Sequence, residues 1–143
     1  MKQRILYLCT GNSCRSQMAE GWTRHLKGDV FDVYSAGVKA QGMNPHAVQV
    51  MKESGVDIAQ QTSKALDSLG EPTFDVVVTV CTHAAECCPS FPGGGRVICR
   101  SFDDPPKLAE TAESEEEVWG CYRRVRDEIR AFVEGLPDSL MSG

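Results

Sequence analysis

Short apolar runs alternate along this chain with longer stretches in which apolar residues recur every three or four positions. The short runs have the length and apolar character of buried strands, and they cover residues 4–8, 31–34, 74–80 and 96–99. The longer stretches predict helices over residues 14–27, 45–54 and 113–134. Because strands that alternate with helices are typical of an α/β fold, we predict a four-stranded parallel sheet flanked by helices on both faces.

The residues between these elements refine the boundaries. Asn44 can cap a helix whose first residue is Pro45, and a glycine follows each predicted helix as a stop. A polar segment that opens at residue 62 predicts one or two helical turns, whereas residues 105–114 are predicted to form a loop. Neither a linker nor a repeat interrupts the pattern, so we predict a single domain over residues 1–143.

Composition narrows the classes of function. The chain has 143 residues and a formal net charge of −5, which does not favour binding to nucleic acid or to an anionic membrane. No apolar run approaches the roughly 18 residues of a membrane span, and no signal peptide is visible, so we expect a cytoplasmic monomer. Seven cysteines are an odd number. In a cytoplasmic protein this indicates catalytic, redox or metal-binding cysteines more than a disulfide framework.

Three loops with reactive side chains follow predicted strands. They are residues 9–16, 81–89 and 101–106. In an open parallel sheet, ligands bind beyond the carboxyl ends of the strands. We therefore expect the three loops to form one site.

The first loop has the spacing of an anion-binding nucleophile. Cys9 and Arg15 bracket five residues, which are Thr10, Gly11, Asn12, Ser13 and Cys14. Such small residues let successive backbone N–H groups curl around an oxyanion, and the N-terminus of the following helix adds partial positive charge. Arg15 can bind two oxygens of the anion, and Ser16 can donate a hydrogen bond to the thiolate of Cys9. We predict that Cys9 is a nucleophile and that Cys14 is a packed thiol.

The second loop supplies more thiols. Three cysteines and His83 could bind zinc, but the paired Cys-x2-Cys elements of a structural zinc site are missing. A redox role explains more, because a second thiol can release an oxidised Cys9, and Cys81 is the nearest in sequence. If the loop were helical, Cys81 and Cys88 would lie about 10.5 Å apart along the axis. A disulfide needs Cα atoms within about 7 Å, so this pair would require unwinding, and Cys87 could compete as partner.

The third loop carries two aspartates on a stiff turn. Asp103 or Asp104 could act as a general acid that protonates the oxygen departing from an attacked oxyanion. The residue types alone leave the choice between them open.

Several stretches together resemble the thioredoxin-coupled arsenate reductases, a family built on the low-molecular-weight tyrosine phosphatase fold, a flavodoxin-like three-layer fold. They are CTGNSCRSQMAEGW, YSAG, FDVVVTVC, FDDP and RRVRDEI, and the resemblance covers nearly the whole chain. The phosphatase relatives share the Cys-x5-Arg-Ser loop and the Asp-Pro element. They lack the cysteines at 81 and 88, and they usually carry aromatic residues where this chain has Pro106 and Lys107.

The resemblance implies a disulfide relay that detoxifies arsenate. Arsenate binds in the loop that ends at Arg15, and Cys9 attacks arsenic with Asp104 as the acid. Cys81 then attacks Cys9 and releases arsenite, and Cys88 attacks Cys81. Thioredoxin finally reduces the Cys81–Cys88 bond. We expect the segment from Cys81 to Cys88 to be helix-like when reduced and looped when oxidised.

The resemblance also raises the question of a potassium ion, which some family members bind at positions that match Asn12, Glu20 and Ser35. Those members have an aspartate where this chain has Lys64, whose ammonium would repel a cation. We therefore expect no metal and no tightly bound cofactor.

Two alternatives to an arsenate reductase remain. One is a low-molecular-weight phosphatase that forms a phospho-enzyme on Cys9, and the other is a thiol-based oxidative sensor or zinc-binding module without turnover.

Overall fold

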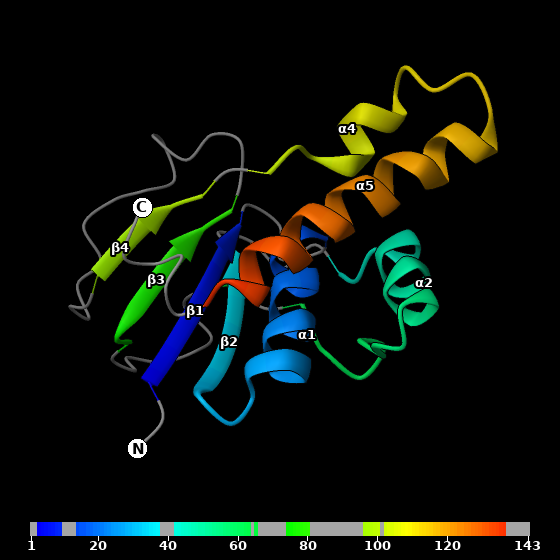
Figure 1. Ribbon diagram of the computed structural model, residues 1–143. Coiled ribbons are helices and arrows are strands. Elements are labelled where there is room, and N and C mark those ends of the chain that lie inside the picture. Colours follow the sequence, from blue (N-terminus) through cyan, green and yellow to red (C-terminus); the bar gives the residue numbers. More distant parts are fainter. Residues whose placement is uncertain are drawn as a thin grey trace.

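The protein is built on a four-stranded parallel sheet. The computed structural model describes residues 3–9, 14–37, 42–63, 65, 74–80, 96–100 and 102–136. The strands are β1 (Gln3–Cys9), β2 (Phe31–Gly37), β3 (Val76–Thr79) and β4 (Arg96–Cys99). All neighbours are parallel, in the order β2-β1-β3-β4 (Figure 1). The predicted sheet is confirmed, and β1 runs through its middle.

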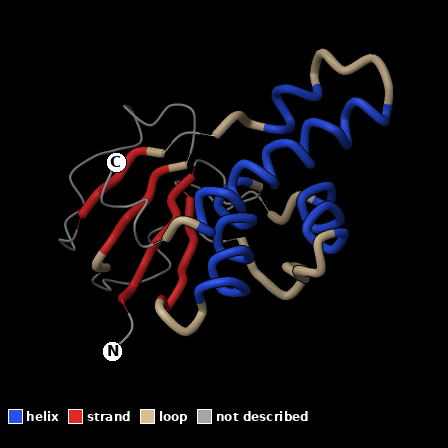
Figure 2. The backbone as a smooth tube through the Cα atoms, in the orientation of Figure 1, coloured by secondary structure: helices blue, strands red, loops and turns tan. Residues whose placement is uncertain are grey.

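Four helices are described. They are α1 (Arg15–Lys27), α2 (Pro45–Glu53), α4 (Pro105–Ala109) and α5 (Glu115–Glu134). They lie on one side of the strands (Figure 2), so the helices predicted on the second face are not among the described residues. There α1 and α5 cover the sheet with a core that includes Tyr7, Trp22 and Ile129, all almost completely buried. None of the described helices is both long and apolar enough to cross a lipid bilayer.

The opposite face of the sheet is also covered. Its side chains form a second buried cluster, Leu6, Leu8, Ala36, Phe74 and Val77. Burial on both faces explains why the strands are nearly continuous apolar runs. The helical turns predicted after residue 62 fall almost entirely outside the described residues.

Local capping fixes the helix boundaries as the sequence predicts. The side-chain oxygen of Asn44 accepts hydrogen bonds from the backbone N–H groups of His46 (2.9 Å) and Ala47 (3.3 Å) at the start of α2. Gly55 follows α2 with a φ of +83°, a left-handed conformation that glycine adopts without strain. Ser114 caps α5 by accepting from the N–H of Glu117 at 3.2 Å.

One prediction about the chain path is wrong. Residues 105–114 were expected to form a loop, but Pro105–Ala109 form α4. Proline has no N–H to leave unsatisfied in the first turn of a helix, and its fixed φ suits that position. The backbone carbonyl of Asp104 accepts the first bond of this turn from Leu108 at 3.0 Å. The two prolines therefore start a helix, and they do so immediately after the candidate acid.

A cluster of charged side chains joins α2 to α5. Arg123 donates two hydrogen bonds to the carboxylate of Glu53, both 2.9 Å long. Arg126 donates to the same carboxylate at 3.2 Å and to the carbonyl of Val50 at 2.9 Å. The hydrogen bonds from Arg123 are the main reason why the pKa of Glu53 lies below its usual value. The last turn of α2 is thereby fixed against α5.

Candidate active site

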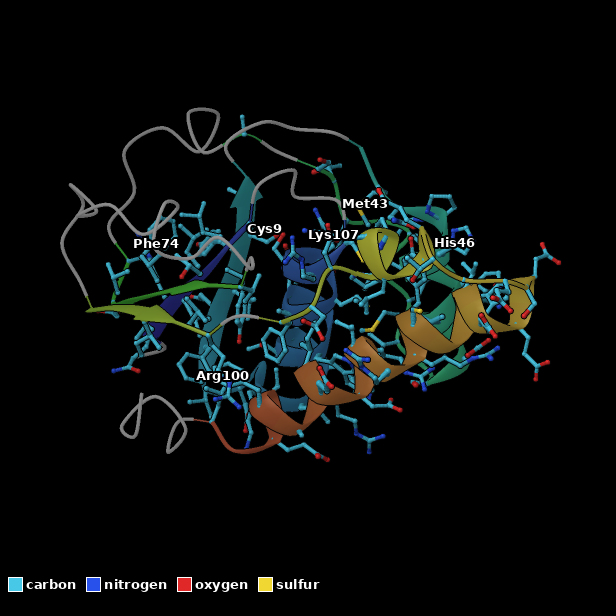
Figure 3. All side chains as sticks on the ribbon, turned by 90° about the horizontal axis from the view of Figure 1, so that it is seen from above. Cys9, Met43, His46, Phe74, Arg100 and Lys107 are labelled. Atoms are coloured by element: carbon cyan, nitrogen blue, oxygen red, sulfur yellow. The ribbon has the colours of Figure 1, made fainter. Side chains whose placement is uncertain are left out.

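The nucleophile expected from the sequence ends the central strand. Cys9 is the last residue of β1, is buried, and lies opposite Gly37 of β2 in the sheet register. Arg15, five residues further on, is the first residue of α1. Seen from above, the labelled Lys107 and Met43 lie between Cys9 and His46 in projection (Figure 3). Cys9 thus ends a strand and Arg15 begins the next helix, as the sequence predicts.

Arg15 is held inside the protein with one donor unused. Its side chain is only 7% exposed, and its Nη1 donates to the backbone carbonyl of Phe102 at 3.0 Å. Its Nε is buried and has no hydrogen-bond partner among the described residues; the nearest carboxylate oxygen, Oδ1 of Asp104, is 3.8 Å away. A buried N–H without a partner is costly. An oxyanion bound beside Cys9 would satisfy it.

Cys14 behaves as a packed thiol. It occupies the N-cap position of α1, is buried, and makes no capping hydrogen bond with its side chain. Burial raises the pKa of its thiol far above the usual range, and the negative charges of Asp104 and Cys9 add to this while Arg15 opposes it. Cys14 therefore stays protonated at neutral pH, in agreement with the sequence prediction.

The geometry separates the two aspartates that the residue types could not. The side chain of Asp104 is 32% exposed and faces the Nε of Arg15. Asp103 instead forms an exposed ion pair with Arg124 of α5, which also lies 3.4 Å from Glu128. Of the two aspartates, Asp104 therefore faces Arg15, and Asp103 pairs with α5.

Two of the residues that match a potassium site, Glu20 and Ser35, are described, and they bond to each other. Glu20 is almost fully buried; its Oε1 accepts a hydrogen bond from the hydroxyl of Ser35, and its Oε2 lies 2.8 Å from Nη1 of Arg24. Both carboxylate oxygens are engaged, and a guanidinium supplies the positive charge. Asn12 and Lys64 lie outside the described residues. Within the described part of the chain, no group of three His, Cys, Asp or Glu side chains could hold a metal ion.

The remaining loop residues and the two relay cysteines are not among the described residues. This applies to Cys81, Cys88 and residues 10–13. Ser16 is described: it is completely buried in the first turn of α1. Val80, which immediately precedes Cys81 in the sequence, donates its N–H to the carbonyl of Leu8 at 3.0 Å. The strand leading to the second cysteine therefore ends beside the strand that carries the nucleophile.

Sequence reasoning missed several polar residues around α1. Arg24, four residues after Glu20, pairs with it across one helical turn, and this spacing could have revealed the contact. The amides of Gln17 and Gln61 bond to each other across 44 positions, for which no local signal exists. With Glu20, Arg24 and Thr62, Gln61 also lines an open cavity of about 590 Å³ on the side of α1.

Comparison with known proteins agrees with this geometry. Residues 4–142 match the family described as "Low molecular weight phosphotyrosine protein phosphatase". The chain belongs to this family. It is 53% identical over 138 residues to an arsenate reductase of Halalkalibacterium halodurans, covering 96% of this chain and 97% of that protein. An arsenate reductase of Bacillus subtilis is 52% identical over 130 residues, which are 90% of this chain and 91% of that protein.

A solved structure gives the same result. The one described as "An arsenate reductase in the phosphate binding state" superposes with a TM-score of 0.75 at 31% identity, covering 95% of this chain and 96% of that chain. The chain is therefore an enzyme of the arsenate reductase group within the family. The resemblance stated from the sequence is confirmed, and so is the phosphatase-like fold.

Proposed function

We propose that this protein reduces arsenate to arsenite with Cys9 as the nucleophile. The observation that carries the proposal is the buried Nε of Arg15, a donor without a hydrogen-bond partner among the described residues, in a guanidinium held by the carbonyl of Phe102. An arginine fixed in this way binds tetrahedral oxyanions. The names of the curated relatives favour arsenate over phosphate.

The first step forms a covalent adduct. The N-terminus of α1 and Arg15 bind the oxyanion and stabilise the Cys9 thiolate. The thiolate forms an S–As bond, one As–O bond breaks, and the departing hydroxyl takes a proton from Asp104 and leaves as water. Asp104 suits this role because it borders Arg15 and keeps partial contact with solvent.

The second step transfers the electrons. The thiolate of Cys81 forms a disulfide with Cys9, and the S–As bond breaks with its electron pair left on arsenic, which leaves as arsenite. Cys88 then attacks Cys81 and frees Cys9, and thioredoxin supplies two electrons to reduce the Cys81–Cys88 disulfide. The hydrogen bond from Val80 to Leu8 supports the first transfer, since it brings the residue before Cys81 next to the residue before Cys9.

One assay tests the relay. Oxidation of NADPH by thioredoxin reductase and thioredoxin is followed with and without arsenate, for the wild type, Cys9→Ser, Cys88→Ser and Cys121→Ser. We expect arsenate-dependent oxidation that Cys9→Ser and Cys88→Ser abolish. Cys121 lies half-buried on α5, so its substitution serves as the matched control. Turnover without Cys88, or no response to arsenate, would refute the relay.

Phosphate-ester hydrolysis is the second candidate, because the family match includes phosphatases and the anion-binding residues are shared. This chain has no aromatic residue at two places where the phosphatase relatives would need one for a phosphotyrosine ring: residues 42–44 are Gly-Met-Asn, and Pro106-Lys107 follow the Asp-Pro element. We therefore expect at most slow hydrolysis of p-nitrophenyl phosphate. A rate above that of arsenate reduction would favour the phosphatase.

We further propose that activity needs no potassium ion. Arg24 already balances the charge of Glu20 at 2.8 Å, and Lys64 stands where the potassium-binding relatives have an acid.

A further inference from the structure

Two side-chain amides, one buried and one partly buried, tie the first turn of α1 to a distant segment. Gln17 lies two residues after Arg15 and is completely buried. Its Nε2 donates to the backbone carbonyl of Thr62 at 3.0 Å. Gln61 in turn donates through Nε2 to Oε1 of Gln17 at 2.7 Å and to the backbone carbonyl of Gln17 at 3.1 Å. The side-chain amides of both residues thus link α1 to residues 61–63.

The segment 61–63 also contacts the other elements that surround Cys9. The hydroxyl of Ser63 accepts a hydrogen bond from the backbone N–H of Gly42 at 3.1 Å. Two residues further, Ala65 forms a parallel bridge with Gly37, the residue opposite Cys9 in the sheet register. Residues 61–63 are therefore anchored at α1 and at the segment before α2, and Ala65 forms the contact with the end of β2.

The start of α1 needs such external support. Its N-cap residue, Cys14, contributes no capping hydrogen bond from its side chain, yet this turn must present Arg15 and its backbone N–H groups to an oxyanion. The Gln17 amide is completely buried and has few alternative arrangements, because a donor or acceptor displaced there loses its partner, and Gln61 is the residue that satisfies its Oε1. The Gln17–Gln61 pair therefore selects one orientation of the turn.

We propose that Gln17 and Gln61 are positioning residues for oxyanion binding. They do not touch the anion. They hold the first turn of α1 in the orientation in which Arg15 and the helix N-terminus face an oxyanion at Cys9. This inference rests on the anion-binding part of the proposed function and does not depend on the relay cysteines.

The test replaces each glutamine by methionine, which has a similar length and volume but cannot make these hydrogen bonds. The variants are Gln17→Met, Gln61→Met and the double variant, with Gln60→Met as control because Gln60 is the exposed neighbour in the same stretch. Phosphate is titrated as the oxyanion probe: its dissociation constant is measured from protection of Cys9 against iodoacetamide, read at Cys9 by tandem mass spectrometry. KM and kcat for arsenate are measured in parallel.

We expect the phosphate dissociation constant and the KM for arsenate to rise roughly tenfold in each single variant, as for loss of a buried hydrogen-bond partner. We expect kcat to change by less than about twofold, because uniform binding is lost while the reacting groups remain. The double variant should resemble the single variants, since the two amides act as a unit. The Gln60→Met control should bind phosphate like the wild type.

Two outcomes overturn the proposal: folded variants that bind phosphate with wild-type affinity, or losses in the double variant that are the product of the single losses. If Gln17→Met does not fold, Gln61→Met, whose side chain is only partly buried, decides the question. If phosphate binding weakens as expected but the wild type does not reduce arsenate, the proposed function fails and the positioning role stands.

Discussion

The two adjacent aspartates allow a sharp test of the general acid. Asp104→Asn keeps the shape of the side chain but removes the proton that the departing hydroxyl needs. A general acid contributes roughly 10² to 10⁴ in rate, so single-turnover formation of arsenite should slow by at least about 10²-fold. The protein should remain stable, because the 3.8 Å between Oδ1 of Asp104 and Nε of Arg15 is too long for a hydrogen bond.

Asp103→Asn is the matched control. It removes the ion pair with Arg124, in which both side chains are about half exposed (54% and 51%). Exposed pairs of this kind contribute about 0.2–1 kcal/mol, so we expect a small loss of stability and a rate within about twofold of wild type.

The assay mixes reduced protein with one equivalent of arsenate, without thioredoxin, and measures arsenite after quenching at successive times. This isolates adduct formation and the first disulfide from recycling. Equal slowing in both variants, or a wild-type rate in Asp104→Asn, would show that the assignment of the acid from the Arg15 geometry is incorrect.

Three further predictions concern stability and ions. Glu53→Gln should lower the free energy of unfolding by about 1 kcal/mol at neutral pH. The pKa of Glu53 is lowered in the folded state from 4.5. The difference in free energy of unfolding between the variant and the wild type should therefore persist above about pH 4.5 and vanish as acid titrates the folded carboxylate. Chemical denaturation at several pH values measures this difference. Gly21→Ala should lower the free energy of unfolding by about 1–3 kcal/mol, because the added methyl group would lie 2.5 Å from a methyl group of Ile58. Gly120→Ala meets nothing within 4 Å and should stabilise α5 by up to about 1 kcal/mol. Similar melting temperatures for the two variants would contradict this packing argument. Arsenate reduction should be unchanged when choline replaces potassium at constant ionic strength, while Arg24→Met should become responsive to potassium; a wild-type enzyme that needs potassium refutes the proposal.

The sequence predicts those features that depend on neighbouring residues. The Cys-x5-Arg spacing locates Cys9 and Arg15 because strand, loop and helix follow one another directly. Asn44 could be identified as a cap because the backbone N–H groups that donate to its side chain lie only two and three positions away. The prolines of residues 105–114 predict a loop, but proline is also favoured in the first turn of a helix, and α4 begins at Pro105.

Other features depend on contacts between distant parts of the chain. Asp103 and Asp104 look equivalent in sequence. In the structure Asp103 pairs with Arg124, which lies 21 residues further along the chain, and not with Arg15. The Gln17–Gln61 pair likewise requires the packing of α1 against residues that follow α2. The disulfide relay through Cys81 and Cys88 stays a prediction, since both lie outside the described residues.

β1 and β3 are neighbours in the sheet although they are far apart in the sequence. Leu8 and Thr79 are register partners although 71 positions separate them, so the reach between the two strand ends is set by the interstrand spacing of about 4.8 Å. In the proposed relay, this spacing gives a thiol that directly follows β3 a high local concentration at Cys9, whatever the length of chain between the strands. Under that proposal, substitutions after a single neighbouring strand are enough to add a redox step to an oxyanion-binding phosphatase framework.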